Sequence, residues 1–419
     1  MRKLFGRAAF PLAAALVCLA ADPVPHWREL NQQARAAVQA KDYARLRELL
    51  LELRPLMGGS PRVTYNLAAA EAKLGNRSRA LAELRNLAGM GLIYDFSKDE
   101  DFGPLRESAE FGAVIKKIDE NRKPATQSTV AFRLDERDLI PEDIAYDSRT
   151  KRFFISSVRK GKILTRDGKE FAKTDWSVFA LRADPAHRIL WATTAWIEQC
   201  ESCLPSDAGK SALLAFDLDS GAPKRRVESP VKGVLGDMTI SSTGDVYVSE
   251  GLHGAFFKLA AGGKELERLD TPGELGSPQT PTLSADEKTI YIPDYLRGIA
   301  AMDVATHAMK WLAPAPDVTL TGIDGLYIAK GEFLAIQNGT VPPRLVRIQL
   351  DAQKAKVIEA NWDGLGDPTH GTVVGDEFYF IANSGWGEYD DKGKKKEGPA
   401  VLSTVHQWKI GRHEAAHKD

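Results

Sequence analysis

The chain has 419 residues, of which 43% are apolar and 27% are charged, and its formal net charge is -1. This length allows two or three domains or one large repeat architecture, and the composition is that of a globular protein able to bury a substantial core. Because phosphate binding requires a concentrated basic face, the balanced charge argues against nucleic acid as the main partner.

The first 21 residues differ from the rest of the chain. Arg2, Lys3 and Arg7 form a positive start, and the Ala-rich apolar stretch Phe10–Ala21 follows. This pattern predicts a cleaved secretory signal and hence a periplasmic or secreted protein, because the apolar stretch is short for a membrane span. A retained N-terminal anchor is the alternative. No later segment is long and apolar enough to cross a bilayer, so we expect no membrane span after signal removal.

Residues 22–123 are expected to form a separate helical domain, because they lack strand patterning and carry apolar residues at helical spacing. The expected helices are Trp27–Ala40, Tyr43–Leu53, Val63–Leu74, Ser78–Leu87 and Phe102–Asn121. The phrases Tyr65-Asn66-Leu67-Ala68 and Leu74-Gly75, with Ala80 and Leu84, resemble the packing positions of tetratricopeptide repeats. This resemblance implies a module that docks a protein partner, and a purely stabilising appendage is the alternative.

From residue 124 to the end at residue 419, short β-branched and aromatic runs alternate with turns that contain Gly, Asp or Pro. One apolar phrase recurs six times at a spacing of roughly 45 residues, the period of four-stranded propeller blades. The six copies are Phe153–Ser156, Leu190–Thr193, Val246–Ser249, Ile290–Pro293, Phe333–Ile336 and Phe378–Ile381. The fold expected for this part is therefore an all-β, six-bladed β-propeller. The stretches Ser128–Leu134 and Ser403–Ile410 are expected to share the last blade, which would close the ring and remove sheet edges.

After the predicted signal is removed, Cys200 and Cys203 are the only cysteines left. In an exported protein this C-x-x-C pair predicts a small disulfide that pins a loop. Zinc binding is an alternative, but no second pair exists to complete a site. A redox role is the other alternative, although the motif follows a strand and does not start a helix.

One residue of each blade is expected at the start of its innermost strand. These residues are Glu142, Phe179, Asp237, Gln279, Asp324 and Thr369, and His370 is adjacent to the last. Such positions line the central channel of a propeller, where like charges repel by several kcal/mol unless neutralised. A divalent cation neutralises them, and oxygen donors favour calcium, with magnesium, manganese or zinc as alternatives. Acidic residues at strand starts also cap turns, which is the structural alternative for each one.

The phrases Pro141-Glu142-Asp143-Ile144, Gly236-Asp237-Met238 and Gly322-Ile323-Asp324-Gly325 resemble those of the senescence-marker-protein/gluconolactonase (regucalcin-like) propellers. The resemblance implies that Glu142, Asp237, Gln279 and Asp324 hold one divalent metal. Asp237 and Gln279 stand where that family usually has Asn, so either the metal preference has changed or the site is degenerate.

The same resemblance implies an enzymatic reaction in the channel. The metal would act as Lewis acid on the carbonyl of a lactone or related ester, and Asp324 would be both ligand and general base. His370 is the additional catalytic candidate, and a structural role within the sixth blade is its alternative. The sequence therefore predicts a metal-dependent hydrolase of a small-molecule substrate, with a non-catalytic binding or scaffold protein as the alternative. Because no Gly-x-Ser-x-Gly elbow is present, a serine hydrolase of that type is excluded.

Overall fold

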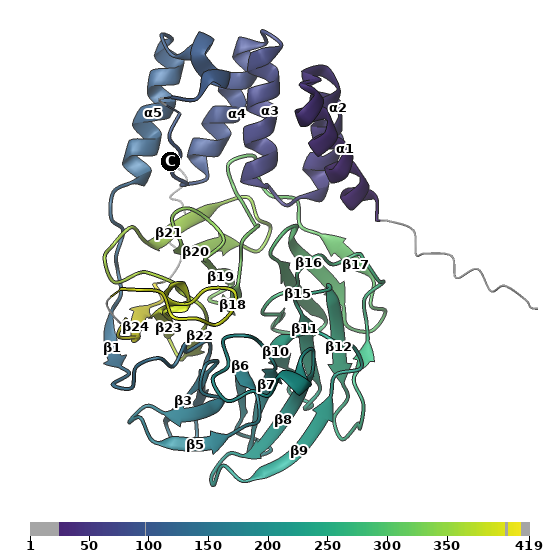
Figure 1. Ribbon diagram of the computed structural model, residues 1–419, viewed down its shortest axis with the longest axis vertical. Helices are drawn as coiled ribbons and strands as arrows, with labels where there is room; N and C mark the ends of the chain where they lie inside the picture. The colour runs from purple at the N-terminus through teal and green to yellow at the C-terminus, as the bar shows by residue number, and fades with distance from the viewer. Residues whose placement is uncertain (1–24, 97, 399–400, 412–419) are drawn as a thin grey trace, which may run out of the picture.

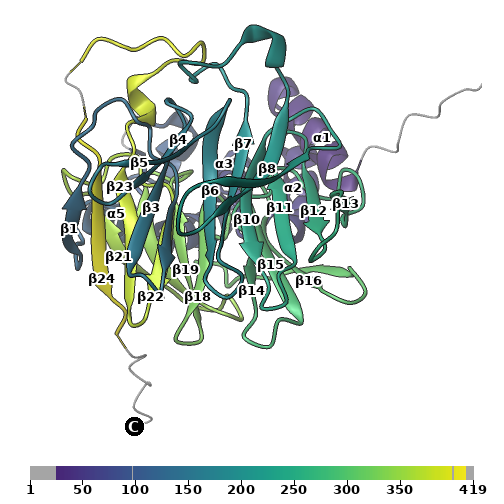
Figure 2. The ribbon, with the colours of Figure 1, turned by 90° about the horizontal axis from the view of Figure 1, so that it is seen from below.

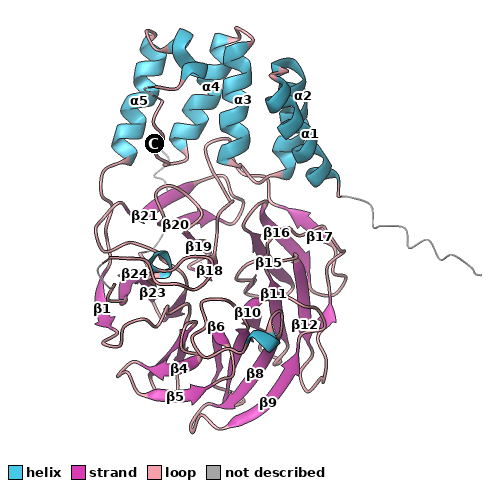
Figure 3. Cartoon of the chain, in the orientation of Figure 1, coloured by secondary structure: helices cyan, strands magenta, loops and turns pink. Residues whose placement is uncertain are grey.

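The computed structural model describes residues 25–96, 98–398 and 401–411. A helical region comes first, and a ring of six four-stranded sheets follows it (Figures 1 and 3). The expected fold class, a six-bladed β-propeller with an N-terminal helical domain, is confirmed. The predicted signal at residues 1–21 lies outside the described residues.

The helical region is a row of antiparallel helices packed through apolar faces. Its α-helices are α1 (His26–Ala40), α2 (Tyr43–Leu53), α3 (Pro61–Lys73), α4 (Arg77–Gly89) and α5 (Ala109–Asn121), with 3₁₀ turns η1 (Arg54–Leu56) and η2 (Glu100–Leu105). Consecutive α-helices pack on one another. The carboxylate of Asp42 caps α2 by accepting from the backbone N–H of Arg45. The tetratricopeptide likeness of these helices stays a prediction.

The helical stretch expected over Phe102–Asn121 is present, but it is interrupted. The stretch divides into η2 and α5, with Ser108 between them as the N-cap that accepts from the N–H of Phe111. Pro104 lies inside η2 and cannot donate a helical hydrogen bond, so the tighter turn ends and α5 starts again from a new cap.

Each blade is an antiparallel sheet built from consecutive strands, except the last. Blade 1 contains β2 (Ile144–Asp147), β3 (Arg152–Ser157), β4 (Lys162–Thr165) and β5 (Glu170–Lys173), and blade 2 contains β6 (Ser177–Asp184), β7 (Ile189–Ala195), β8 (Ser211–Asp217) and β9 (Pro223–Glu228). Blade 3 contains β10 (Leu235–Ile240), β11 (Val246–Glu250), β12 (Ala255–Leu259) and β13 (Glu267–Arg268), and blade 4 contains β14 (Thr282–Leu283), β15 (Thr289–Asp294), β16 (Gly298–Asp303) and β17 (Met309–Trp311). Blade 5 contains β18 (Gly325–Ala329), β19 (Glu332–Gln337), β20 (Arg344–Gln349) and β21 (Ala355–Ala360), and blade 6 contains β22 (Gly371–Val374), β23 (Glu377–Asn383) and β24 (Thr404–Lys409) with β1 (Thr129–Arg133). All six predicted copies of the apolar phrase fall in the second strand of a blade.

Blade 6 closes the ring with strands from both ends of the propeller. The N-terminal strand β1 pairs with β24, with Thr129 opposite Gln407 and Arg133 opposite Thr404. The predicted closure is therefore confirmed, and it leaves no open edge between the first and last blades. Seen at right angles to the first view (Figure 2), the blades stand side by side around the ring.

Apolar side chains fill the spaces between neighbouring blades. Between blades 6 and 1, for example, Ile144, Phe153, Ile155, Ile381 and Val405 form one buried cluster. Truncating a fully buried Phe in such a cluster costs about 3–5 kcal/mol, because a cavity is added to the lost transfer energy. This packing makes the ring rigid and holds the starts of the inner strands in fixed positions.

The helices lie along one side of the ring, next to blades 4 and 5 (Figure 1). Two buried arginines of the propeller connect the two parts. The Arg297 guanidinium lies over the ring of Trp311, 3.9 Å from its centroid, and donates to the carbonyl of Leu56 at 3.3 Å. Arg344 donates to the carbonyl of Met90 at 2.6 Å. A backbone bond from Leu320 to the carbonyl of Gly58, 2.9 Å long, adds a third attachment.

Within the described part of the chain, no helix combines the length and the apolar character that crossing a bilayer requires.

Candidate metal centre

Four polar residues from four blades meet at the axis of the propeller. We call Glu142, Asp237, Asp324 and His370 the channel cluster. They come from blades 1, 3, 5 and 6, and each is at least nine-tenths buried. Glu142, Asp324 and His370 each offer one potential metal-ligand atom, and these three atoms lie within 4.8 Å of one another.

The imidazole of His370 occupies the centre of the cluster. Its Nδ1 donates to the main-chain carbonyl of Glu142 at 2.9 Å, so the hydrogen bond crosses from blade 6 to blade 1 and is not confined to blade 6. Because a carbonyl can only accept, Nδ1 carries a proton. The other nitrogen, Nε2, lies 3.0 Å from Oδ1 of Asp237 and 3.8 Å from Oδ1 of Asp324.

The Nε2 atom of His370 is buried and makes no hydrogen bond of acceptable geometry, in spite of its closeness to Asp237. Thr369, the preceding residue, also has a buried hydroxyl with no hydrogen-bond partner among the described residues. Buried polar atoms normally have partners, so such atoms indicate an ion, water or ligand. A histidine that donates one N–H to a carbonyl and leaves the other nitrogen free is the usual arrangement of a metal ligand.

The surroundings of the channel cluster shift the pKa values of Glu142, Asp324 and His370. Burial raises the pKa of Glu142 to about 8, and the neighbouring charges of Asp324 and Asp237 act in the same direction. Burial also raises the pKa of Asp324 to about 6. For His370, burial lowers the pKa, but Asp237 and Asp324 outweigh it and raise the pKa well above its ordinary value. Strongly perturbed groups in one place are typical of functional sites.

Two further side chains orient the carboxylates of the cluster. Trp386 Nε1 donates to Oε2 of Glu142 at 2.5 Å, and Asn338 Nδ2 donates to Oδ2 of Asp324 at 2.6 Å. Asn338 is itself held, because its Oδ1 accepts from the hydroxyl of Tyr295 at 3.0 Å. Neither Trp386 nor Asn338 is among the site residues predicted from the sequence. For Asn338, its position just after the apolar strand β19 was the only available signal.

Asp143 follows Glu142 and has a different role. Side chains alternate along extended backbone, so Asp143 turns away from the axis, toward blade 2. Its Oδ1 accepts from the N–H of Ile144, and its Oδ2 accepts from the N–H of Leu181 at 2.8 Å and from Arg182 at 2.5 Å. These bonds join blades 1 and 2 and fix the backbone from which Glu142 projects.

Gln279 and Phe179, two of the predicted channel positions, do not belong to the channel cluster. The side-chain amide of Gln279 donates to the hydroxyl and carbonyl of Ser277, at 3.1 and 3.3 Å, so it engages its own loop in blade 4. Its role as a metal ligand stays a prediction. Phe179 is buried against apolar neighbours that include Ile140 and Tyr389, and so provides an apolar wall.

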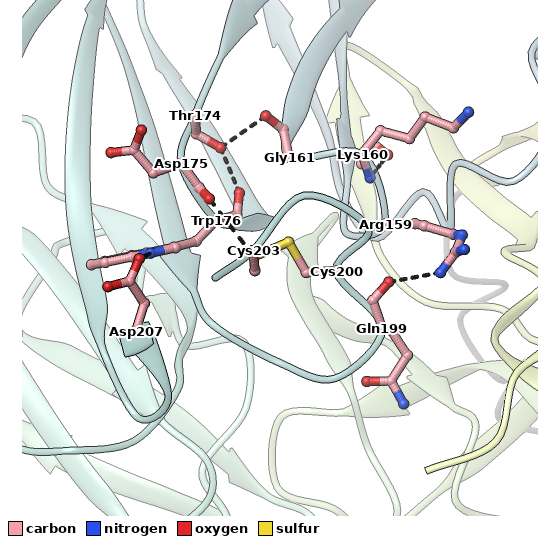
Figure 4. Close-up of a disulfide and its surroundings, with 11 residues drawn as sticks. Arg159, Lys160, Gly161, Thr174, Asp175, Trp176, Gln199, Cys200, Cys203 and Asp207 are labelled. Atoms are coloured by element: carbon pink, nitrogen blue, oxygen red, sulfur yellow. Dashed lines mark hydrogen bonds between the residues drawn. A yellow bond between two sulfur atoms is a disulfide. The ribbon is translucent and has the colours of Figure 1, made fainter. Parts of the chain in front are cut away.

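A disulfide joins Cys200 and Cys203 in the loop after β7, and their Cα atoms are 5.5 Å apart (Figure 4). The loop is also fixed from blade 1, because Arg159 Nη1 donates to the carbonyl of Gln199 at 3.0 Å. The disulfide contributes no side chain to the channel cluster.

The donor set of the cluster suits a divalent metal, but it differs from the all-oxygen set that was expected. Calcium prefers oxygen ligands, whereas an imidazole combined with carboxylates suits zinc, manganese or iron. Glu142, Asp324 and His370 could therefore hold such an ion, with Asp237 next to them.

Comparisons with known proteins concern the fold. No protein-family model and no curated protein matches the chain. A calcium-binding protein, regucalcin, from Agrobacterium tumefaciens is 15% identical and covers 61% of this chain and 87% of its own, with a TM-score of 0.46. A streptogramin B lyase is 16% identical over 66% of this chain and 95% of its own, with a TM-score of 0.45. A PQQ-bound aldose sugar dehydrogenase from Streptomyces coelicolor is 13% identical over 68% of this chain and 99% of its own, with a TM-score of 0.44. No function follows from likenesses at this level. The six-bladed β-propeller is established by the strand order of the chain itself, and this fold carries many different activities.

Proposed function

We propose that the protein is an exported, metal-dependent hydrolase of a lactone or related ester, with its reaction centre at the channel cluster. The observation that carries this proposal is the convergence of Glu142, Asp324 and His370 at the axis, with potential ligand atoms within 4.8 Å of one another. The resemblance of the sequence around Glu142, Asp237 and Asp324 to gluconolactonase-like propellers supports the same reaction class.

Glu142, Asp324 and His370 would hold the metal, which when bound supplies a Lewis acid for the carbonyl oxygen of the substrate. Asp324 accepts the proton of the attacking water, because its carboxylate is buried and has a pKa raised to about 6, close to the range in which a general base works at neutral pH. Asn338 keeps that carboxylate in one orientation through its 2.6 Å hydrogen bond.

Export is part of this proposal. The Cys200–Cys203 disulfide is typical of an oxidising compartment, and it supports the signal predicted from the first 21 residues. The helical region is proposed to occupy residues 22–123 and to dock a protein partner, and the propeller to occupy residues 124–419.

A second candidate function, a non-catalytic binding protein, is favoured by one feature of the same cluster. Protonated His370 would itself be a cation between Asp237, Asp324 and Glu142, so these carboxylates could coexist at the axis without a metal. In that case the cluster is a structural ion network and the propeller is a platform for a partner.

Metal content and lactone hydrolysis separate the two functions. The purified protein is treated with a chelator, reloaded separately with zinc, manganese and calcium, and assayed with a five- and a six-membered lactone and with phenyl acetate. We expect one ion to bind with a stoichiometry near one and to restore hydrolysis, and Asp324→Asn to lower kcat/KM by about 10²–10⁴. Absence of metal binding would favour the binding protein. Hydrolysis that survives Asp324→Asn would contradict the assigned base.

A further inference from the structure

A cavity lies where the helices meet the propeller, outside the channel cluster. We call it the interdomain pocket. It has a volume of about 1000 Å³, and its walls come from α1, α3 and the segment after α4 on one side and from loops of blades 4 and 5 on the other. This volume is at the upper end of the range for small-molecule sites. Because both parts of the chain form its walls, the pocket exists only in the assembled protein.

Three arginines line the interdomain pocket on the helical side: Arg28, Arg35 and Arg62. Among the described residues, none of the three forms an ion pair with a carboxylate, although many other arginines of the chain do. Arg62 donates to the side-chain oxygen of Asn31 at 2.7 Å, and Arg28 lies over the ring of Trp27 at 4.6 Å. Of the described residues that line the pocket, Asp95 alone is acidic, so the three arginines give this lining an excess of positive charge.

Burial and the neighbouring charge of Arg35 lower the pKa of Arg62, so the two guanidinium groups repel each other. Paired arginines without a carboxylate partner are the usual device for binding carboxylate, sulfonate or phosphate groups, since each guanidinium presents a planar fork of donors. An anion between these groups would remove the repulsion.

Aromatic side chains form the rest of the wall. Trp27, Tyr65 and Tyr94 come from the helical region, and Tyr295 comes from blade 4. The rings of Tyr65 and Tyr94 are nearly parallel, with centroids 6.1 Å apart, and both line the same pocket as the arginines. Flat aromatic walls favour ligands that contain a planar ring.

We propose that the interdomain pocket is a binding site for a small anion that carries a planar ring, with Arg35 and Arg62 binding the anionic group and the aromatic wall packing on the ring. The pocket adjoins the channel, because Tyr295 lines it and donates to Asn338, which in turn donates to Asp324. The proposal does not depend on hydrolysis in the channel, since it concerns binding alone.

Two fluorescent probes of matched shape test the proposal. The first, 8-anilino-1-naphthalenesulfonate, is a ring-bearing anion, and the second, N-phenyl-1-naphthylamine, has the same rings without the sulfonate. Both are titrated into the full chain, into the double variant Arg35→Gln/Arg62→Gln, and into the control Arg77→Gln/Arg79→Gln. The control removes two exposed arginines of α4 that do not line the pocket. Melting temperatures establish that each variant is folded.

We expect the sulfonate probe to bind at one site, with a Kd that rises at least about tenfold in Arg35→Gln/Arg62→Gln and stays unchanged in the control, because charge-assisted hydrogen bonds are lost. The neutral probe should bind the wild type and the double variant within about twofold of each other. The proposal is overturned if the folded double variant binds the sulfonate probe as well as wild type does. It is also overturned if a heptaglutamate peptide displaces that probe at lower concentration than 1-naphthalenesulfonate does, since the site would then be a peptide site.

Discussion

His370 of blade 6 reaches across the channel to Asp237 of blade 3, and its Nε2 lies 3.0 Å from the carboxylate oxygen Oδ1. These two blades face each other in a ring of six, so the contact spans the axis of the propeller. The Nδ1 proton is fixed by the carbonyl of Glu142, which leaves Nε2 as the atom that either binds a metal or carries a second proton.

The metal preference of the channel cluster should depend on His370. Replacing it by glutamine removes the nitrogen donor, so His370→Gln should weaken zinc or manganese binding by at least about tenfold, and calcium binding by much less. Isothermal titration of chelator-treated protein measures the affinity for zinc or manganese and the affinity for calcium. His253→Gln is the matched control, because that side chain is 61% exposed in a loop of blade 3. Calcium binding that is tightest, and unaffected by His370→Gln, would contradict the prediction.

Asn338 should contribute to turnover more than to substrate binding. Asn338→Ala removes the 2.6 Å hydrogen bond that orients Asp324, so kcat for lactone hydrolysis should fall by about tenfold or more while KM changes little. Steady-state kinetics with the metal-loaded protein measure the two parameters. Asn86→Ala, in helix α4, should leave both unchanged. A rise in KM at constant kcat would show instead that Asn338 contacts the substrate.

Stability in acid should depend on Asp147, far from the channel cluster. Its carboxylate is buried and accepts from Arg188 and Thr150; these hydrogen bonds outweigh the effect of burial and lower its pKa to about 2. A lowered pKa stabilises the fold above the ordinary pKa near 4, and this contribution is lost as the pH falls toward 2. Asp147→Asn should therefore cost about 3 kcal/mol of unfolding free energy at pH 7, because Arg188 loses its buried partner.

Chemical denaturation of wild type and Asp147→Asn at pH 7 and at pH 3 tests this. The difference in unfolding free energy should narrow at the lower pH, because at pH 3 the Asp147 carboxylate of the unfolded chain, with its ordinary pKa near 4, is largely protonated and folding must release that proton. Asp219→Asn serves as control, since that carboxylate also binds Arg188 but is 60% exposed. An equal difference at both pH values would show that charge is not the cause.

The attachment of the helices to the propeller should depend on Arg297. This guanidinium lies between Trp27 and Trp311 and donates to main-chain carbonyls of both parts, at Leu56 and Glu274. Arg297→Ala should cost about 3 kcal/mol and should expose the linker near Pro124 to proteases. Limited proteolysis followed by mass determination of the fragments measures this. The control is Arg226→Ala, which removes a guanidinium from the outer strand β9. This variant should not change the cleavage pattern.

Several features of the protein could be predicted from sequence alone. The recurring apolar phrase with the period of a blade predicted six sheets, because side-chain alternation and turn residues are local properties of each strand. The closing strands β1 and β24 followed from the same pattern, since a ring of blades must cover its edges. The equivalent positions in successive repeats also predicted that Glu142, Asp237 and Asp324 lie at the channel.

The helical stretch Phe102–Asn121 and the metal preference were harder to predict, for different reasons. In the first case the interruption of the helical stretch has a local signal, Pro104 followed by the cap Ser108. In the second, the preference for calcium assumed that the cluster contained only oxygen donors, whereas the position of His370 at its centre depends on a hydrogen bond to another blade.

By itself, therefore, the sequence determined the repeat, the fold and the axial position of the acidic residues, because each of these depends on spacing within one blade. The tertiary structure alone decided which side chains meet: Asn338 with Asp324, Trp386 with Glu142, and His370 with Asp237. It also decided that arginines of α1 and α3 line one pocket together with aromatic residues of the helical region and of blade 4. Such contacts join residues from different blades or domains, and their geometry is set by how those units pack against one another, which no local pattern encodes.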